Sequence, residues 1–322
     1  MKLISIVVPV FNEEANIQHF YEAVRDVMAT LDYDYEIIFV DDGSKDRSRE
    51  ILHELERSDV RVQPIFLARN FGHQLALTCG LDFADGDAVI TMDGDMQHPP
   101  EMIPTLIKEW EAGFEVVQTI RVTTEGVSVL KKATSALYYK MLNLISTVPV
   151  QPGGSDFRLM DKIVVKAFRR CREHARFIRG MIGAMGYRQK KIEFVAPPRF
   201  AGKSKFSIKK MFRLAVDGIL AFSTVPLKFS FYAGILSSIV SVILFMHVLY
   251  EKYIENDAVA GWATILTCLL FFGGMQLLVL GVLGEYVGRI FEETKGRPLY
   301  LIARGKPKDE ENDGPSAVGG RI

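Results

Sequence analysis

The sequence predicts an α/β domain with a mostly parallel sheet, followed by two helices that cross a membrane. Three observations lead to this prediction. Short apolar runs alternate with helical patterns up to about residue 118, polar loops follow the apolar runs, and two long apolar stretches lie beyond residue 228. Of the 322 residues, 48% are hydrophobic, and the mean hydropathy of +0.13 is high for a soluble protein. Part of the chain is therefore expected to lie in lipid.

The first part of the chain alternates strand patterns with helix patterns. Such alternation predicts a mostly parallel sheet with helices on both faces. Ligands bind at the carboxyl ends of the strands in these sheets, so the polar loops that follow the strands are expected to form one nucleotide-sized site. The predicted strands are Leu3 to Val10, Tyr35 to Asp41, Val62 to Leu67, Ala88 to Met92 and Glu115 to Gln118, and the predicted helices are Ala15 to Leu31, Ser44 to Arg57, Gln74 to Phe83 and Met102 to Ala112.

The loop after the fourth predicted strand is rich in oxygen ligands, with Asp93, Gly94, Asp95 and Gln97 close together. In an extended stretch, positions i and i+2 project to the same side, so Asp93 and Asp95 are expected to face one pocket in which Gly94 leaves room for a ligand. Carboxylate and amide oxygens suit Mg²⁺ or Mn²⁺, which keep coordination positions open for substrate phosphates. The alternative is an acidic turn exposed to solvent at the end of a strand.

Two apolar stretches, Phe229 to Tyr250 and Trp262 to Leu283, reach the roughly 20 residues that a helix needs to span a bilayer. The loop between them is acidic on balance, whereas lysine and arginine residues precede the first stretch and follow the second. The positive-inside rule then places the α/β domain and both termini in the cytoplasm, in a multi-pass protein of the inner or plasma membrane. A buried hairpin of a globular core is the alternative, although uncharged runs of this length exceed ordinary core helices.

Residues 206 to 222 form an amphipathic pattern with Lys209, Lys210 and Arg213 on its polar side. A basic amphipathic helix directly before a span is expected to lie in the membrane interface, and an ordinary surface helix is the alternative. The tail after Arg304 is charged and rich in Gly and Pro, so it is expected to be disordered. The predicted organisation is a cytoplasmic domain over 1–205, an interfacial helix over 206–226, a transmembrane hairpin over 227–285 and a cytoplasmic segment over 286–322.

Charge and cysteine content exclude several classes of protein. The 39 Lys and Arg residues balance 39 Asp and Glu residues, so the net charge is zero and gives no indication of nucleic-acid binding. Cys79, Cys171 and Cys268 are scattered without the spacing of metal ligands. This pattern argues against a zinc site or a disulfide framework and fits a reducing compartment.

Six motifs occur along the chain in a fixed order: Val8 to Glu14, Val40 to Ser44, Arg69 to Gly72, Met92 to Pro99, Ser155 to Met160 and Arg199 to Lys205. With these motifs the sequence resembles the polyprenyl-phosphate glycosyltransferases of glycosyltransferase family 2, which include dolichyl-phosphate mannose synthase and bacterial bactoprenol glucosyltransferases. The resemblance covers about residues 3 to 300. It implies a GT-A fold, a nucleotide-diphosphate-sugar donor, a polyprenyl-phosphate acceptor and inversion at the anomeric carbon. UDP-glucose is the preferred donor by this resemblance, followed by donors of mannose, an N-acetylhexosamine or an aminosugar.

The resemblance also implies roles for individual residues on the donor side. The base and the ribose of the donor are assigned to Pro9, Phe11, Glu13 and Asp41, with Asp42 nearby. The ribose-diphosphate and its Mg²⁺ or Mn²⁺ are assigned to Asp93, Asp95 and Gln97, with Asp95 and Gln97 as the preferred direct metal ligands. A nucleoside diphosphate leaves readily only when its developing charge is neutralised, and a bound cation does this as a Lewis acid.

On the acceptor side, a lipid phosphate must approach a donor that is already anionic, so cations must offset the repulsion. The family pattern places the phosphate-binding residues on Arg121, on Ser135 and on the loop from Arg199 to Lys205. Relatives often carry a second arginine three residues after the first, where this chain has Thr124. For Lys132 and Lys209, a solvated charge at the membrane surface is the alternative. The candidate groups for the lipid phosphate are Arg121, Lys131, Lys132, Ser135, Arg199, Lys203 and Lys205.

Asp156 stands where relatives have the general base. A phosphate monoester is mostly dianionic at neutral pH and needs little deprotonation, so Asp156 is alternatively expected to orient the sugar or a cation, or to pair structurally with Arg158. Two histidines, His73 and His98, lie in the loops that follow the third and fourth predicted strands, and neither is assigned to the metal. His98 is expected to orient its loop through a hydrogen bond, and His73 to contact the nucleotide or cap a helix.

Two other functions compete with this interpretation. A processive polysaccharide synthase would carry a Gln-x-x-Arg-Trp block, which precedes neither Trp110 nor Trp262. A non-catalytic membrane scaffold that kept the fold is disfavoured by the intact aspartate pairs and by uncharged spans, which lack the polar groups of a solute pathway. Relatives with two spans can assemble as tetramers, so a homo-oligomer is also compatible with the sequence.

Overall fold

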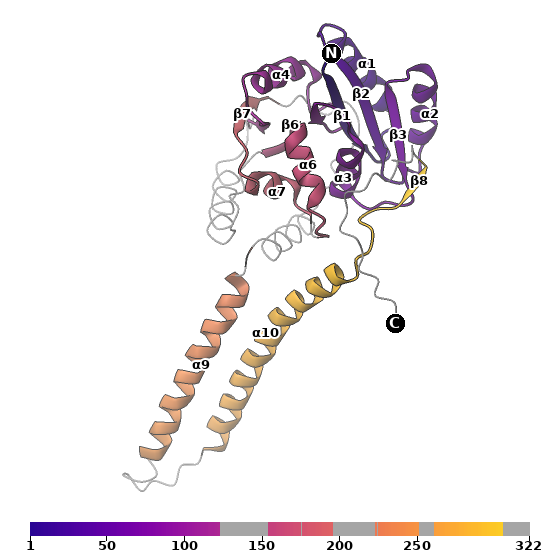
Figure 1. The fold of residues 1–322 in the computed structure, drawn as a ribbon. Helices are drawn as coiled ribbons and strands as arrows, with labels where there is room; N and C mark the ends of the chain where they lie inside the picture. Colours follow the sequence, from indigo (N-terminus) through magenta and orange to yellow (C-terminus); the bar gives the residue numbers. More distant parts are fainter. Residues whose placement is uncertain (123–153, 175, 196–222, 224, 251–260, 305–322) are drawn as a thin grey trace, which may run out of the picture.

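A computed structural model gives the fold of the chain (Figure 1), and it describes residues 1–122, 154–174, 176–195, 223, 225–250 and 261–304. Several predictions fall outside these residues. They concern the interfacial helix up to residue 222, the acidic loop between the two spans and the tail after Arg304.

The described residues build one eight-stranded sheet in the order β7-β5-β6-β4-β1-β2-β3-β8. The central strands β4, β1, β2 and β3 are parallel, as is the pair β5 and β7, whereas β6 runs antiparallel to β4 and β5, and β8 runs antiparallel to β3. The predicted fold class, a mostly parallel α/β sheet, is confirmed. The strands are β1 (Leu3–Val10), β2 (Asp34–Asp41), β3 (Val62–Leu67), β4 (Ala88–Thr91), β5 (Val116–Arg121), β6 (Gly154–Asp161), β7 (Gln189–Phe194) and β8 (Ile302–Arg304).

Strand β6 was not predicted, although it lies between β4 and β5 in the middle of the sheet. The sequence of β6 does not show the pattern of a central strand, because Asp156 and Arg158 interrupt the apolar run that such a strand normally has. Both side chains are nevertheless buried, and they lie close enough to form an ion pair. A pair of opposite charges thus takes the place of two apolar residues in the interior.

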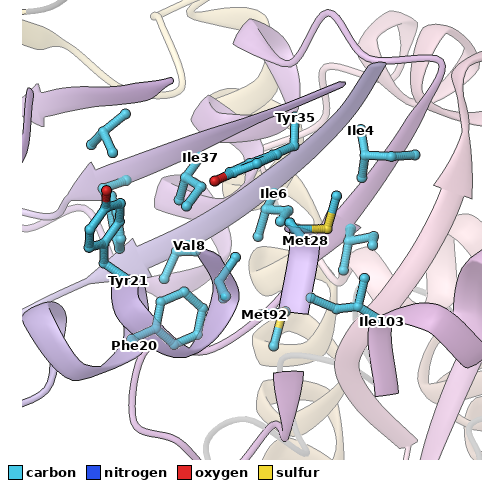
Figure 2. Packing of buried hydrophobic residues seen from close by; sticks show 14 of the residues in the cluster. Ile4, Ile6, Val8, Phe20, Tyr21, Met28, Tyr35, Ile37, Met92 and Ile103 are labelled. Atoms are coloured by element: carbon cyan, nitrogen blue, oxygen red, sulfur yellow. The ribbon is translucent and has the colours of Figure 1, made fainter. Parts of the chain in front are cut away.

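Helices cover both faces of the sheet, and the side chains of β1 alternate between two apolar cores. Ile6 and Val8 pack with α1, α2 and α4, whereas Val7 packs with α3, α6 and α7. Figure 2 shows the first of these cores, which includes Phe20 of α1 and Val8 of β1. The helices are α1 (Ile17–Met28), α2 (Ser48–Ser58), α3 (His73–Phe83), the 3-10 turn η1 (Pro100–Met102), α4 (Ile103–Glu111), α6 (Lys162–Arg170) and α7 (Ile178–Ala184).

Gly43 lies where the loop after β2 touches the loop after β3. Its φ of +74° is left-handed, and an added Cβ would lie 2.7 Å from the carbonyl carbon of Arg69. Only glycine fits both the backbone conformation and this close approach. The absence of a side chain at Gly43 therefore allows the two loops to lie in direct contact.

Gly43→Ala is expected to destabilise the full-length protein by more than the roughly 1–3 kcal/mol that a strained φ costs alone. The matched control is Gly186→Ala, because Gly186 has a similar φ of +77° but no neighbouring atom within 4 Å of an added Cβ. Thermal unfolding in detergent, followed by the fluorescence of the buried Trp110, should show the larger loss for Gly43→Ala. Equal losses would contradict the role of the close approach.

Two long helices, α9 (Val225–Tyr250) and α10 (Trp262–Thr294), extend away from the sheet side by side (Figure 1). Within them, Val225–His247 and Cys268–Thr294 are long and apolar enough to cross a membrane. The two predicted spans are thus present as helices, but α10 continues past Leu283 to Thr294, through Glu285 and Arg289. The second helix therefore extends farther toward the catalytic domain than its apolar pattern indicates.

The segment that follows α10, residues 295–304, returns to the sheet and is called the C-terminal strap here. It ends in β8, which pairs with β3, and Leu299 is buried. Polar contacts fasten the strap and the end of α10 to the domain. They join the backbone N–H of His174 to Oε1 of Glu293 (2.7 Å), Nε2 of His174 to the carbonyl of Arg297 (3.0 Å), the hydroxyl of Tyr300 to Oδ2 of Asp82 (2.7 Å) and the N–H of Ala68 to the carbonyl of Leu301 (2.9 Å).

Candidate active site

The loops after β1 and β2 are fastened to each other at the carboxyl edge of the sheet. The N–H of Asn12 donates to Oγ of Ser44 (2.9 Å), and the N–H of Lys45 donates to Oδ1 of Asn12 (2.8 Å). Asn12 takes a left-handed φ of 54°, which asparagine tolerates better than most residues. Three of the four residues predicted to hold the donor base and ribose, Pro9, Phe11 and Glu13, lie half-buried at this edge.

The predicted nucleotide residues Asp41 and Asp42 are both buried. Nε of Arg49, on α2, lies 2.6 Å from Oδ2 of Asp41. The two oxygens of Asp42 accept the N–H groups of Phe71 (2.6 Å) and Gly72 (2.9 Å). Burial raises the pKa of Asp42, and these two hydrogen bonds oppose the rise. Asp42 therefore holds the loop after β3 in place.

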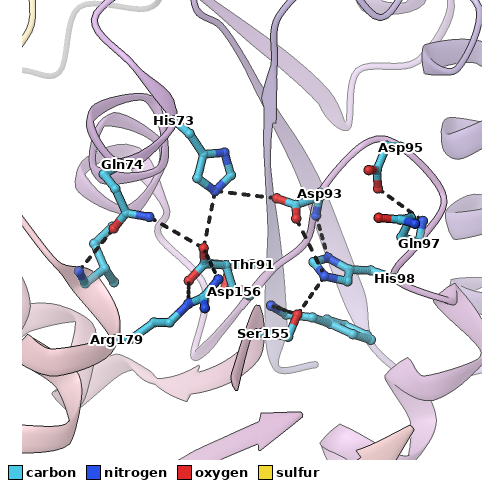
Figure 3. Close-up of polar contacts among 12 residues, drawn as sticks. His73, Gln74, Thr91, Asp93, Asp95, Gln97, His98, Ser155, Asp156 and Arg179 are labelled. Carbon is cyan, nitrogen blue, oxygen red and sulfur yellow. Dashed lines mark hydrogen bonds and ion pairs between the residues drawn. The ribbon is translucent and has the colours of Figure 1, made fainter. Parts of the chain in front are cut away.

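The acidic loop after β4 is a turn, so the expectation of an extended stretch was wrong. Gly94 and Asp95 take turn positions, and Met96 has a left-handed φ of 62°. As a result, the carboxylates of Asp93 and Asp95 have different partners (Figure 3). Asp93 lies 3.5 Å from Nε2 of His73, whereas Oδ1 of Asp95 accepts the N–H of Gln97 at 3.1 Å. Asp and Gly favour turns, and here that local preference overrides continuation of the strand.

His98 orients the acidic turn through a hydrogen bond, as predicted. Its Nδ1 accepts the N–H of Asp93 at 2.8 Å, and its Nε2 lies 2.6 Å from Oγ of Ser155. The ring stacks on Phe157 with centroids 5.2 Å apart. Burial lowers the pKa of His98 despite nearby carboxylates. Because Nδ1 accepts a backbone N–H, it carries no proton, and the proton of the neutral ring is assigned to Nε2. His98 thus connects the acidic turn with β6.

His73 is the first residue of α3, and its ring does not cap the helix, which was one of its two expected roles. The other role, contact with the nucleotide, stays a prediction. Nε2 of His73 lies 3.4 Å from Oδ2 of Asp156 and 3.5 Å from Oδ1 of Asp93 (Figure 3). Burial acts against protonation, yet the hydrogen bond to Asp156 and the charge of Asp93 raise the pKa of His73 to about 9. At neutral pH a cation therefore bridges the two carboxylates.

Asp156 is buried and surrounded by cations. Nε and Nη2 of Arg179 lie 2.7 and 2.9 Å from its two oxygens, and Nη2 of Arg158 lies 3.3 Å from Oδ1. Burial would raise the pKa of Asp156, but the hydrogen bond from His73 and the charge of Arg179 hold it well below its usual range. The pairing with Arg158 was foreseen. The pairing with Arg179 was not, since α7 gives no sequence signal that it faces the site.

Of the residues predicted to bind the lipid phosphate, the structure describes only Arg121. Arg121 ends β5 and is exposed. The other candidates for the lipid phosphate lie outside the residues that the structure describes, and so does the position of the second arginine of the family pattern. They are Thr124, Lys131, Lys132, Ser135, Arg199, Lys203 and Lys205.

The donor atoms of the acidic turn fit a divalent cation that is shared with a substrate. Among the described residues, no three His, Cys, Asp or Glu side chains converge as a ready-made metal site. Mg²⁺ is commonly held by only one or two carboxylates together with substrate phosphates. Asp95 and Gln97 are half-buried at the edge, and the side chain of Asp93 is 36% exposed. These oxygens suit a cation whose remaining coordination positions are filled by the diphosphate of a substrate.

Residues 5–168 match the family model described as glycosyl transferase family 2. The chain belongs to that family. This family 2 glycosyltransferase is 43% identical to an uncharacterized glycosyltransferase of Bacillus subtilis over 93% of both chains. It is 41% identical to the bactoprenol glucosyl transferase of Shigella phage SfV, over 95% of this chain and 99% of the relative. Among solved structures it is similar to S. aureus TarS 1-349 in complex with UDP-GlcNAc, with 16% identity and a TM-score of 0.45 over 69% of this chain and 66% of that one.

Proposed function

We propose that the enzyme transfers a single hexose, glucose from UDP-glucose, to a polyprenyl phosphate at the cytoplasmic face of a membrane. Inversion at the anomeric carbon and dependence on Mg²⁺ or Mn²⁺ are part of the proposal. The observation that carries it is the similarity to the phage bactoprenol glucosyl transferase over 95% of this chain. A match of that extent takes in both the acidic turn and the two helices that are long enough to cross a membrane.

On the donor side, we assign the base and ribose to the carboxyl edge of β1 and β2, at Pro9, Phe11, Glu13 and Asp41. Asp42 acts there by holding the loop after β3 through Phe71 and Gly72. Asp95 and Gln97 would hold the cation, with Asp93 beside them. When bound, the cation supplies charge neutralisation for the departing nucleoside diphosphate.

On the acceptor side, the phosphate monoester is its own nucleophile, because its second pKa near 6 leaves it mostly dianionic at neutral pH. Two unit charges 4 Å apart interact by about 4 kcal/mol at an effective dielectric constant of 20. Repulsion between two anions in the site is therefore large enough to need local cations. We assign this role to Arg121, Arg199 and the lysines Lys203 and Lys205 by the family pattern, and to Lys131 by its charge. Ser135 would add a hydroxyl donor to the lipid phosphate.

The proposal is tested with the full-length enzyme in vesicles that contain undecaprenyl phosphate. UDP release from UDP-glucose should require both the lipid phosphate and Mg²⁺ or Mn²⁺, should stop on addition of a chelator, and should form one lipid-linked hexose that partitions into organic solvent. GDP-mannose and UDP-N-acetylglucosamine are the competing donors. UDP release that is independent of the lipid, or growth of a polymer, would contradict the proposal.

A further inference from the structure

The carboxylate of Asp156 is faced by more cations than it needs for charge balance. His73 reaches it from α3, Arg158 from β6 and Arg179 from α7, and Gln74 adds a neutral contact at 3.5 Å. Asp93, on the acidic turn, is the second carboxylate of the group and joins it through His73 (Figure 3). Among the described residues of this cluster, two arginines thus face the single carboxylate of Asp156. His73 places this group beside the acidic turn.

The two arginines differ in what they expose. The side chain of Arg158 is 2% exposed, and its Nη2 also donates to the carbonyl of Ser155 at 3.0 Å. The side chain of Arg179 is 39% exposed, although two of its nitrogens are held by Asp156 at 2.7 and 2.9 Å. Two parallel N–H···O contacts fix the plane of a guanidinium group. Arg179 is therefore held rigidly beside Asp156, while more than a third of its side chain stays exposed.

Asp156 shows the opposite pattern. Its side chain is 7% exposed, and both of its oxygens have donors. A carboxylate offers about four lone-pair positions, so these contacts leave little capacity for a proton or a substrate hydroxyl. The depressed pKa of Asp156 agrees with this geometry. The carboxylate is better placed to hold a neighbour than to react.

We propose that Arg179 is a substrate-contacting residue of this site and binds a phosphate oxygen at the reacting centre, while Asp156 is the positioning residue that holds its guanidinium in place. This inference rests on the proposed function and names a residue that the sequence motifs did not. The phosphate belongs either to the diphosphate of the donor or to the lipid phosphate. A planar, fixed guanidinium matches the oxygens of either one.

The experiment compares Arg179→Gln, Arg179→Lys, Asp156→Asn and the double variant Arg179→Gln/Asp156→Asn with the wild-type full-length enzyme. Two measurements show whether Arg179 binds the diphosphate of the donor or the phosphate of the lipid. One is the Kd for UDP with Mn²⁺ in the absence of lipid, and the other is the pair of KM values for UDP-glucose and undecaprenyl phosphate. Arg179→Gln is expected to raise the UDP Kd and the UDP-glucose KM about tenfold if it binds the diphosphate, or the lipid KM alone by that factor if it binds the lipid phosphate. Arg179→Lys should recover only part of the loss, since a point charge lacks the two-nitrogen geometry.

The double variant tests the role of Asp156. If Asp156 acts through Arg179, then Asp156→Asn should reduce turnover little further once Arg179 is glutamine. Additive losses would overturn the positioning role, and so would unchanged UDP affinity together with unchanged KM values in Arg179→Gln. Arg172→Gln is the matched control, because Nη1 of Arg172 lies 3.0 and 2.8 Å from the two oxygens of Asp82, near the end of α3 opposite to His73. That variant should keep the UDP Kd and both KM values.

The same measurements distinguish a wrong substrate assignment from a wrong role for Arg179. If the wild-type enzyme transferred no hexose to undecaprenyl phosphate, the substrate assignment would fail, yet the UDP affinities of the wild-type and Arg179→Gln enzymes could still be compared. If the wild type transferred hexose normally and Arg179→Gln kept the UDP Kd and both KM values, only the role proposed for Arg179 would be rejected. The proposed function would stand. Thermal unfolding of each variant shows whether a loss reflects folding instead.

Discussion

Asp95→Ala is expected to lower the rate of hexose transfer by about 10²–10³-fold while the protein stays folded. The size of the loss follows from removing a group that stabilises charge developing on the leaving diphosphate. The protein is expected to stay folded because Asp95 is half-buried and its hydrogen bond to the N–H of Gln97 lies within the turn. Initial rates at saturating UDP-glucose, over a range of Mn²⁺ concentrations, measure the effect.

The matched control for this variant is Glu101→Ala, because Glu101 is an exposed acid in η1, just beyond the same turn. Glu101→Ala should keep both the rate and the dependence on Mn²⁺. Binding of Mn²⁺ to the UDP-loaded protein, followed by electron paramagnetic resonance, provides a readout that does not need turnover. Wild-type turnover in Asp95→Ala would remove Asp95 from the metal site.

Asp156→Asn is expected to destabilise the protein by about 3–5 kcal/mol, the usual cost of removing one partner from a buried ion pair. The loss arises because Arg158 stays buried without a compensating negative charge. Thermal unfolding in detergent and metal-free buffer, followed by the fluorescence of Trp110, measures it. Adding Arg158→Met should restore part of the stability and none of the activity, since the uncompensated charge is removed with it. No change in the melting temperature at pH 6 would contradict this account.

The destabilisation should also depend on pH in a defined way. The folded-state pKa of Asp156 lies well below its ordinary value of 3.8, so its stabilisation is present above about pH 4 and is lost as the pH falls through the folded value. The pKa of His73 is raised from 6.5 to about 9, so its stabilisation is complete below 6.5 and is lost as the pH rises through 9. The difference between wild type and Asp156→Asn should therefore be largest between about pH 4 and 6.5 and should narrow toward pH 9. A constant difference from pH 6 to 9 would contradict the part assigned to His73.

The first half of the fold could be predicted because its signals are local. The runs Leu3–Val10 and Val62–Leu67 show apolar side chains that need no partner to be recognised as strands, and the structure has them at the same residues. Strand β6 could not be found in this way, since Asp156 and Arg158 look like surface residues until their partners are known. Those partners include Arg179, which follows 23 positions later and pairs only through the tertiary fold.

The site was predictable in part for the same reason. Residues that act through their position after a strand, such as Asp42 and Asp95, are visible in the sequence. The direction of each side chain is not, because it depends on contacts across the sheet. Asp93 turns to His73 and His98 instead of sharing the partner of Asp95, and Asp41 pairs with Arg49 from α2. Neither choice follows from the spacing of the residues.

Helix α10 and the C-terminal strap form a continuous connection between the second candidate membrane span and the loop after β3. The helix has 33 residues and is therefore about 50 Å long, and the strap ends in β8, beside β3. The carbonyl of Leu301 accepts the N–H of Ala68, which directly precedes the loop that Asp42 holds. A helix that tilts or shifts to match the hydrocarbon core moves everything fastened to its end. In the proposed membrane-bound enzyme, the thickness of the bilayer would therefore help to set how high the carboxyl edge of the sheet stands above the lipid.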